Sequence, residues 1–333
     1  MSSSLTIAIP TYNANPEHLL EALESLDPQV EAAGGRVTVV VVDNASDAPQ
    51  AAAVAGFAAR FPRFRFVRHE QNLGFDRNVL RVLDSVHSNF VWFFGDDDIL
   101  YSVALDEVLA AIDGTPQATV VLSRAHFFHE TGEVTNRTLH STLEPVVLRG
   151  ADFVYRTSFT AAALSTFCVS APAMRGASLR FSVGSNWVHF AALLVLFSDP
   201  EAVGVLLDEP LLAVRRSNSA RWFANFGNQY STGIAVITMI RDGLVAGVTP
   251  EFYEFFRRAR FANNPIDILT LAWPLTWASR RRLYVESRQH FGGFWRFRLL
   301  DAPLLFIPNW SKASFSAAVR VAGAVRRRLA PSH

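Results

Sequence analysis

Three consecutive carboxylates, Asp96, Asp97 and Asp98, are the residues of this sequence with the clearest capacity for chemistry. They follow an apolar run, residues 90–94, and a glycine, Gly95. A short apolar run that stops at a turn signal is typical of a buried strand. Adjacent acids repel one another unless a positive charge lies beside them, and hard divalent cations prefer carboxylate oxygens. The stretch is therefore either a divalent-cation site facing a phosphate-bearing ligand or an ordinary acidic loop or helix start.

The spacing within the acidic stretch separates its members. In an extended segment, Asp96 and Asp98 point to the same side and Asp97 points to the other. Gly95 permits a tight bend that brings the backbone close to a ligand. We therefore expect Asp96 and Asp98 to act together, whereas the spacing gives Asp97 no definite role.

The elements that must position these acids follow an alternating pattern. The predicted strands are residues 5–13, 36–46, 64–72 and 90–94, and the predicted helices are residues 15–26, 49–61 and 74–86. Alternating strands and helices predict an α/β fold with a doubly wound, mostly parallel sheet, in which ligands bind beyond the carboxyl ends of the strands. Polar residues form the end of each strand or follow it at that edge: Thr11, Tyr12, Asn13, Asp43, Asn44, Asn72, Gly74 and the three acids.

Four motifs carry a resemblance to a known family: IAIPTYN, VVVVDNASD, EQNLGFDRN and FFGDDDIL. Their order and approximate spacing resemble those of the family 2 glycosyltransferases, which have the A-type nucleotide-sugar-binding fold. The resemblance covers residues 5–110, is looser past Ile112 and ends near Ser219. The form GDDDIL is most similar to the abequosyltransferase-like branch, which builds bacterial surface polysaccharides such as O-antigen or capsule.

This resemblance implies roles for individual residues. Asp98, with Asp96, would hold Mg²⁺ or Mn²⁺ on the donor diphosphate, while Asp96 would also face the ribose and Asp43 would accept a hydrogen bond from the base. Arg77 is either part of the loop beside the nucleotide or a surface charge. The implied nucleotide-sugar-binding residues are Pro10, Thr11, Tyr12, Asn13, Asp43, Asn44, Asn72, Gly74, Arg77, Asn78, Asp96, Asp97, Arg215, Arg216 and Asn218.

The catalytic base is the point at which the sequence departs from the family. An apolar helix is predicted to begin near Trp187, and the family usually has an acidic pair there, whereas this chain has the sequence NWVHF. His189 is the natural candidate base because imidazole takes up a proton near neutral pH. The alternative is a histidine that only packs at the helix start. Other acids that would serve are Asp152, Asp199 and Asp208.

A later segment, residues 209–219, resembles the strand and loop where the family often has a histidine that contacts the metal or the diphosphate. Ser217 occupies that position here, while Arg215, Arg216 and Asn218 remain. An arginine that reaches the diphosphate is physically sensible, since guanidinium pairs well with phosphate oxygens. A surface pair of arginines is the alternative.

Composition sets the broad organisation of the chain. The 333 residues are 50% hydrophobic and 18% charged, enough for an α/β core with an appended region and too apolar for disorder. We predict a catalytic domain at residues 1–220, with a nucleotide-sugar-binding half at 1–112 and an acceptor half at 113–220, and a helical basic extension at 221–333. The chain has one cysteine, Cys168, so it cannot form an internal disulfide. The sequence shows neither the pattern of a signal peptide nor an apolar run long enough to span a membrane, so we expect a cytoplasmic protein.

Charge is unevenly distributed along the chain. From Glu251 onward there are 14 Arg and Lys against 5 Asp and Glu, whereas the whole chain has 31 against 30. Arginine interspersed with large aromatics suits an anionic membrane interface, so we expect peripheral association with the inner face of the plasma membrane. The alternative is a helical region that packs on the catalytic domain or forms an oligomer. We expect no nucleic-acid partner, because no nucleic-acid-binding module is recognised.

Taken together, the residues and the resemblance predict an inverting, metal-dependent glycosyltransferase. It would move a sugar from a nucleotide diphosphate sugar to a hydroxyl of a glycan or a lipid-linked saccharide. The alternative is a non-catalytic, sugar-nucleotide-binding or scaffold subunit of a polysaccharide assembly complex. Nucleotidyl transfer is a weaker prediction, since the sequence has no glycine-rich, lysine-bearing phosphate loop and its only lysine is Lys312.

Overall fold

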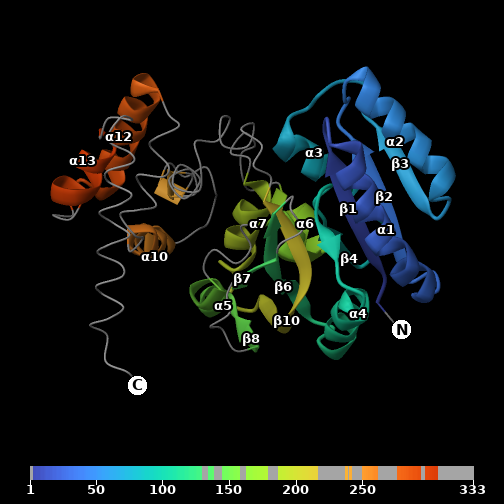
Figure 1. Ribbon diagram of the computed structural model, residues 1–333. Helices are drawn as coiled ribbons and strands as arrows, with labels where there is room; N and C mark the ends of the chain where they lie inside the picture. Colours follow the sequence, from blue (N-terminus) through green and yellow to red (C-terminus); the bar gives the residue numbers. More distant parts are fainter. Residues whose placement is uncertain are drawn as a thin grey trace. The chain divides into compact units, whose positions relative to one another are not determined.

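Figure 1 shows the computed structural model of the protein. It describes residues 3–129, 134–138, 145–157, 163–178, 187–216, 237–238, 240–241, 250–261, 276–293 and 297–306. The described residues divide into two compact units, residues 3–216 and residues 237–306. Each unit is considered by itself.

The first half of the first unit alternates strands and helices as the sequence predicts (Figure 1). Its elements are β1 (Leu5–Thr11), α1 (Pro16–Ala32), β2 (Val37–Asp43), α2 (Ala48–Arg60), β3 (Phe64–Arg68), α3 (Phe75–Val82), η1 (Leu83–Ser85) and β4 (Phe90–Phe93). The strands lie in the order β3-β2-β1-β4 and all run parallel. Their carboxyl ends therefore meet at one edge, the edge where ligands bind in such sheets.

Helices cover both faces of this parallel sheet. Alternate residues of β1, β2 and β4, such as Ile7, Val39 and Trp92, form one buried core with the apolar side of α1, which includes Leu19 and Leu23. Helix α3 contacts β1 and β2, and α6 (Ala171–Ser178) contacts β4. Because both faces are covered, the strands are apolar throughout rather than alternating. The prediction of a doubly wound sheet is confirmed.

The second half of this unit extends the same sheet. Its elements are β5 (Ile99–Leu100), α4 (Ala104–Gly114), β6 (Ala118–His129), β7 (Val134–Thr138), β8 (Val146–Arg149), α5 (Gly150–Thr157), η3 (Leu164–Thr166), β9 (Phe167–Ser170), α6, α7 (Val188–Leu196) and β10 (Val203–Arg216). The strand order continues as β4-β9-β6-β10-β5. Strand β9 lies antiparallel between β4 and β6, while β6 and β10 pair in parallel. The sheet is thus mostly parallel, as predicted, with β9 reversed at its centre, while β5 and β8 pair antiparallel with β10 and β7 pairs antiparallel with β6.

The described part of the second unit is helical. It contains α10 (Pro250–Phe261), α12 (Trp277–Phe291), the π-helical turn η4 (Phe297–Asp301) and α13 (Ala302–Leu304). Aromatic rings pack against one another here, as in the pairs of Tyr284 with Phe297 and of Phe291 with Phe297. The predicted helical, aromatic and arginine-rich character of the extension is therefore present in these residues. Among the residues described in either unit, no helix is both long and apolar enough to cross a membrane.

Candidate functional site

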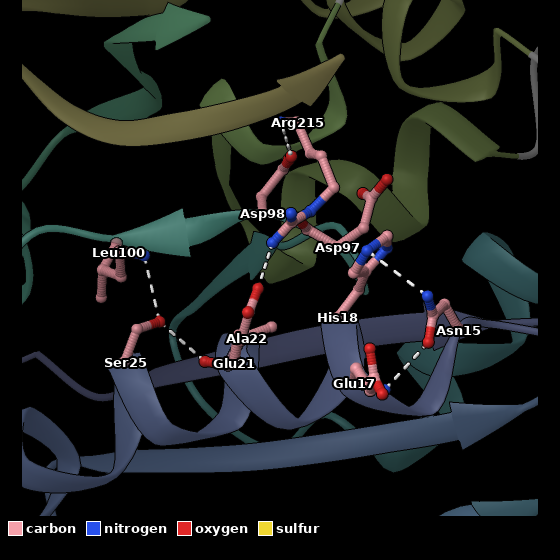
Figure 2. A network of polar contacts seen from close by, with 10 residues as sticks. All are labelled: Asn15, Glu17, His18, Glu21, Ala22, Ser25, Asp97, Asp98, Leu100 and Arg215. Atoms are coloured by element: carbon pink, nitrogen blue, oxygen red, sulfur yellow. Dashed lines mark hydrogen bonds and ion pairs between the residues drawn. The ribbon is translucent and has the colours of Figure 1, made fainter. Parts of the chain in front are cut away.

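The three acids lie in a turn between β4 and β5, at the carboxyl end of the central parallel strand β4. The expectation of an extended segment is wrong, since Asp96 and Asp97 form the turn itself. The chain must bend here because β5 leaves β4 to pair antiparallel with β10. The amide of Leu100 donates to Ser25 Oγ of α1 at 3.0 Å, so the far end of this segment is tied to α1 (Figure 2).

Asp98 is the most enclosed of the three acids, with 5% of its surface exposed. Its Oδ1 accepts a hydrogen bond from the backbone N–H of Arg215 at 2.9 Å, and its Oδ2 accepts one from Ser165 Oγ. Burial raises the pKa of Asp98 from the usual 3.8 to about 6, and these hydrogen bonds act in the opposite direction. The site therefore holds a carboxylate in a position where its charge has lost much of its hydration.

The other two acids share this electrostatic strain. Burial raises the pKa of Asp96, which lies beside Thr11 and the backbone of Tyr12 at the end of β1. The pKa of Asp97 is raised well above its usual range by burial and then by repulsion from Asp98 and Asp96. Asp96 therefore faces the end of β1, whereas Asp98 faces Ser165 and β10. Three such carboxylates favour a positively charged ligand or partner.

Arg215, at the end of β10, is that cationic partner (Figure 2). Its Nε donates to the backbone oxygen of Asp97 at 2.9 Å, and its guanidinium forms an ion pair with Glu21 of α1. The guanidinium also lies 4.4 Å from the ring centre of Phe128, and the side chain is only 5% exposed. Arg215 is thus engaged within the site and is not a surface arginine. Asn218 and the side chain of Arg216 lie outside the described residues.

A second polar cluster lies at the ends of β2 and β3. Asp43 is 2% exposed, and its carboxylate accepts hydrogen bonds from Ser46 and pairs with Arg68. The same guanidinium donates to the backbone oxygen of Ser46 at 2.8 Å. The side chain of Arg68 remains 48% exposed, so the ion pair is buried on the carboxylate side only. This fixes the orientation of Asp43 at the sheet edge.

The β1 and α3 loops are joined to the same edge by amide side chains. Asn44 donates from Nδ2 to Asn72 Oδ1 at 2.9 Å and accepts from the amide of Leu73 at 2.9 Å. Gly74 precedes α3 with φ of 79°, a conformation that suits glycine. Four further predicted residues lie in this region: Pro10 and Thr11, buried in β1, Tyr12, which is 46% exposed, and Asn13, which exchanges hydrogen bonds with Asp47.

Helix α3 carries two of the predicted site residues, Arg77 and Asn78, of which the first is exposed and the second is buried. Asn78 is 3% exposed and accepts no hydrogen bond at Oδ1 from the described residues. Asp76, which directly precedes Arg77 in α3, is buried and accepts a hydrogen bond from the backbone N–H of Val188 at 3.3 Å. The first turn of α3 and the start of α7 are therefore connected.

His189, the candidate base, lies in the first turn of α7 and is 3% exposed. Its ring lies 5.6 to 6.5 Å, centre to centre, from the rings of Trp187, Phe167 and Phe75. These contacts fit the packing alternative as well as a shielded base. The other acids considered lie elsewhere: Asp152 is exposed in α5, Asp199 accepts the amide of Glu201 in a turn, and Asp208 faces Arg124 at 3.5 Å.

Sequence reasoning missed the groups that hold the predicted residues in place. Ser165, Glu21 and Arg68 each contact a predicted site residue through a side chain. Glu21 lies on the polar side of a helix and resembles its neighbouring acids, so no sequence signal distinguishes it. Ser165 lies just before β9, and only the reversed direction of that strand brings it to the carboxyl edge of β4, which no local pattern in the sequence indicates.

The sequence of the chain matches a known protein family. A model of glycosyl transferase family 2 matches residues 6–179, which is more than half of the chain. The chain therefore belongs to this family. The match spans the ends of β1 to β4, the acidic turn and Ser165. No curated protein matches the chain in sequence.

Solved structures of TarS from S. aureus have the same fold. One TarS structure has a TM-score of 0.57 and 16% identity, and the match covers 91% of this chain and 52% of that one, so this chain spans about half of it. TarS 1-349 in complex with UDP-GlcNAc has a TM-score of 0.57 and 15% identity, covering 93% and 92% of the two chains. The complex of TarS 1-349 with UDP has a TM-score of 0.54, also at 15% identity, covering 93% and 91%.

Proposed function

We propose that this glycosyltransferase moves a sugar from a nucleotide diphosphate sugar to a hydroxyl of a glycan or a lipid-linked saccharide. The observation that carries the proposal is the buried Asp98, fixed at both carboxylate oxygens at the carboxyl end of β4. The oriented carboxylate of Asp43 and the exposed ring of Tyr12 lie at neighbouring strand ends, where a nucleotide would bind. The UDP-GlcNAc and UDP complexes of TarS support a nucleotide sugar as donor.

The acids fit a hard divalent cation that is shared with the donor. No group of three or more His, Cys, Asp or Glu side chains among the described residues is arranged to hold a metal alone. Mg²⁺ is commonly held by one or two carboxylates together with substrate phosphates, which is what Asp98 and Asp96 offer. Such an ion, Mg²⁺ or Mn²⁺, would neutralise charge on the departing diphosphate.

The reaction that fits this site is a single displacement. A base takes the proton of the acceptor hydroxyl, and the acceptor oxygen forms a bond to the anomeric carbon. The bond from that carbon to the diphosphate oxygen breaks, and its electron pair leaves with the nucleoside diphosphate. The anomeric configuration is inverted, which NMR of the product would test. We propose His189 as the base, since imidazole takes up a proton near neutral pH and this residue lies in the first turn of α7, where the family usually has an acidic pair.

A thermal-shift panel of nucleotide diphosphate sugars, with and without Mn²⁺, tests donor binding and identifies the nucleobase and the sugar. Asp98→Ala should abolish the Mn²⁺-dependent part of the shift and the turnover of the donor. Asp84→Ala is the matched control, because this acid is exposed and pairs with Arg81 at the surface. Unchanged turnover in Asp98→Ala would refute the role of Asp98.

Two substitutions separate the roles of His189. His189→Phe keeps an aromatic ring among Phe75, Phe167 and Trp187 but removes the proton acceptor, whereas His189→Ala removes both. A catalytic base predicts loss of transfer in both variants while donor binding persists. Transfer retained in His189→Phe would assign His189 to packing alone.

The resemblance of the motif GDDDIL supports a proposal for the class of acceptor and pathway. We propose an abequosyltransferase-like role, transferring a hexosyl or deoxyhexosyl group in bacterial surface polysaccharide synthesis. Lipid-linked and free saccharide acceptors, offered in parallel with the donor that the panel identifies, test this assignment. Transfer to free monosaccharides alone would contradict it.

The second unit supports a peripheral position at the cytoplasmic face of the membrane. Its helical elements carry exposed apolar and exposed cationic side chains: Trp277, Val285, Leu299, Arg281, Arg288 and Arg298. Such a mixture binds anionic bilayers. The protein should sediment with phosphatidylglycerol vesicles at low salt, and Trp277→Ala should weaken binding while Val147→Ala, exposed in the first unit, should not. Binding insensitive to salt and to Trp277→Ala would contradict this, and self-association instead would indicate an oligomer contact.

A non-catalytic donor-binding subunit is the second candidate. The deep burial of His189 and the absence of an acidic pair at the start of α7 favour it. Calorimetry would then give tight binding of the donor while no acceptor in the panel is glycosylated. Any stoichiometric, enzyme-dependent transfer would exclude this candidate.

A further inference from the structure

Ser165 is a fully buried polar residue with no place yet in the proposed function. It lies in η3, directly before β9. Strand β9 runs antiparallel to β4, with Trp92 opposite Cys168, so the start of β9 lies at the carboxyl end of β4. The reversed strand therefore delivers Ser165 to the acidic turn.

The hydrogen bonds of Ser165 have a fixed direction. Its Oγ accepts the backbone N–H of Gly95 at 2.7 Å and also bonds Asp98 Oδ2. A serine hydroxyl has a single hydrogen, and an amide N–H can only donate. The hydroxyl hydrogen is thus directed at the carboxylate of Asp98. The backbone oxygen of Ser165 in turn accepts the indole N–H of the buried Trp92 at 2.7 Å, which holds the residue itself in place.

The surroundings leave this arrangement little freedom. The other carboxylate oxygen of Asp98 is held by the backbone N–H of Arg215 at 2.9 Å. A Cβ added at Gly95 would lie 2.8 Å from Asp98 Oδ2 and 3.1 Å from Ser165 Oγ, closer than unstrained packing allows. Asp98 is therefore fixed from two sides, by one side chain and one backbone group.

We propose that Ser165 is a positioning residue, whose hydroxyl orients the Asp98 carboxylate toward the cation and the donor diphosphate. This inference rests on the proposed function, because it takes Asp98 as the carboxylate that binds there. Ligating carboxylates are themselves usually hydrogen-bonded, and loss of such a partner typically costs about 10- to 100-fold in metal affinity or activity. Ser165 makes no contact with the ligand in this role and acts through Asp98.

Calorimetric titration of Mn²⁺ into the protein in the presence of UDP measures the contribution of Ser165 to the affinity for the cation. We expect Ser165→Ala to weaken Mn²⁺ binding by about tenfold. Thr166→Val is the matched control, because Thr166 is an adjacent buried hydroxyl that donates to the backbone oxygen of Ala163 at 2.8 Å. It should lower the melting temperature comparably and leave Mn²⁺ binding unchanged.

A double-mutant cycle separates positioning from general destabilisation. If Ser165 acts only through Asp98, Ser165→Ala should weaken Mn²⁺ binding in the natural background and have no further effect beside Asp98→Asn, which keeps one side-chain oxygen for the cation but no acceptor for the Ser165 hydroxyl. If Ser165→Ala does not fold, Ser165→Cys serves in its place, since the thiol has similar size but is a weaker donor. It should show a smaller loss in the same direction.

The outcomes distinguish this inference from the function on which it rests. Normal Mn²⁺ binding in Ser165→Ala, or an equal loss in Thr166→Val, overturns the positioning role while leaving the role of Asp98 intact. Full Mn²⁺ affinity in Asp98→Ala refutes the metal role itself, and the positioning role falls with it. Loss in Asp98→Ala and in Ser165→Ala, with no further effect of Ser165→Ala beside Asp98→Asn, supports both.

Discussion

Asp98→Asn should stabilise the protein when metal and nucleotide are absent. Burial raises the pKa of Asp98 to about 6 from the usual 3.8. At 1.36 kcal/mol per pKa unit, the difference amounts to roughly 3 kcal/mol of folding free energy. The folded state prefers the protonated acid, so this penalty is absent below pH 3.8, grows as the pH rises and is complete above about 6. Asparagine removes the charge and with it the penalty.

The substitution also has a cost, which sets the net effect. In Asp98→Asn the new side chain keeps an oxygen for the N–H of Arg215, but its amide group would face Ser165, whose hydroxyl hydrogen then loses its acceptor. A lost hydrogen bond of this kind costs about 1 kcal/mol. We therefore expect a net gain of about 2 kcal/mol at pH 7.5, or a rise in Tm of about 4–8 °C for a unit of this size.

Thermal unfolding in EDTA at pH 7.5 and pH 5 measures this effect. The stabilisation by Asp98→Asn should shrink as the pH is lowered. At pH 5 the charge penalty that the substitution removes is about half of its value at pH 7.5, because Asp98 is then largely protonated in the folded protein. Asp84→Asn, at an exposed surface pair, should change little. An Asp98→Asn variant that is less stable than the unaltered protein, or a difference independent of pH, would refute the reasoning.

Two further substitutions probe the groups around the predicted residues. Arg68→Ala removes the cationic partner of the buried Asp43. We expect the free energy of unfolding to fall by only about 1 kcal/mol, because Arg68 is half exposed, and we expect calorimetry to show weaker binding of the donor. Arg65 is exposed on the same strand, so Arg65→Ala should change neither the stability nor the binding. Gly95→Ala places a methyl group 2.8 Å from Asp98 Oδ2, so we expect about 1–3 kcal/mol of destabilisation by thermal melting and loss of Mn²⁺-dependent donor binding; a neutral result would mean that the turn relaxes easily.

The sequence predicted the frame of the site because periodicity determines it. Continuous apolar runs and helical stripes identify β1 to β4 and their helices, and parallel strands bring their carboxyl ends to one edge. Four strand ends with polar residues then predict one cluster without further information. In the structure, Asn44 is hydrogen-bonded to Asn72, and Asp43 directly precedes Asn44 at the end of β2. The acidic turn follows β4 at the same edge of the sheet.

The supporting contacts could not be predicted in the same way, because they join segments far apart in the chain. Glu21 meets Arg215 from a helix near the start of the unit, and Ser165 meets Asp98 only because β9 runs against its neighbours. Strand direction in the second half depends on tertiary packing and not on the local pattern. The extended geometry expected for Asp96 to Asp98 was wrong for a related reason, since the pairing of β5 with β10 requires a turn there.

The charge balance of this edge links the arginine to the need for a cation. Among the described residues, Arg215 is the cationic side chain that is hydrogen-bonded to the acidic turn, and it also forms an ion pair with Glu21. Four carboxylates therefore share one guanidinium, and two like charges about 4 Å apart repel by roughly 4 kcal/mol at an effective dielectric of about 20. A diphosphate adds further negative charge, so its approach is unfavourable unless a divalent cation accompanies it. Arg215 already serves the protein's own acids, and the proposed Mg²⁺ or Mn²⁺ would serve the donor.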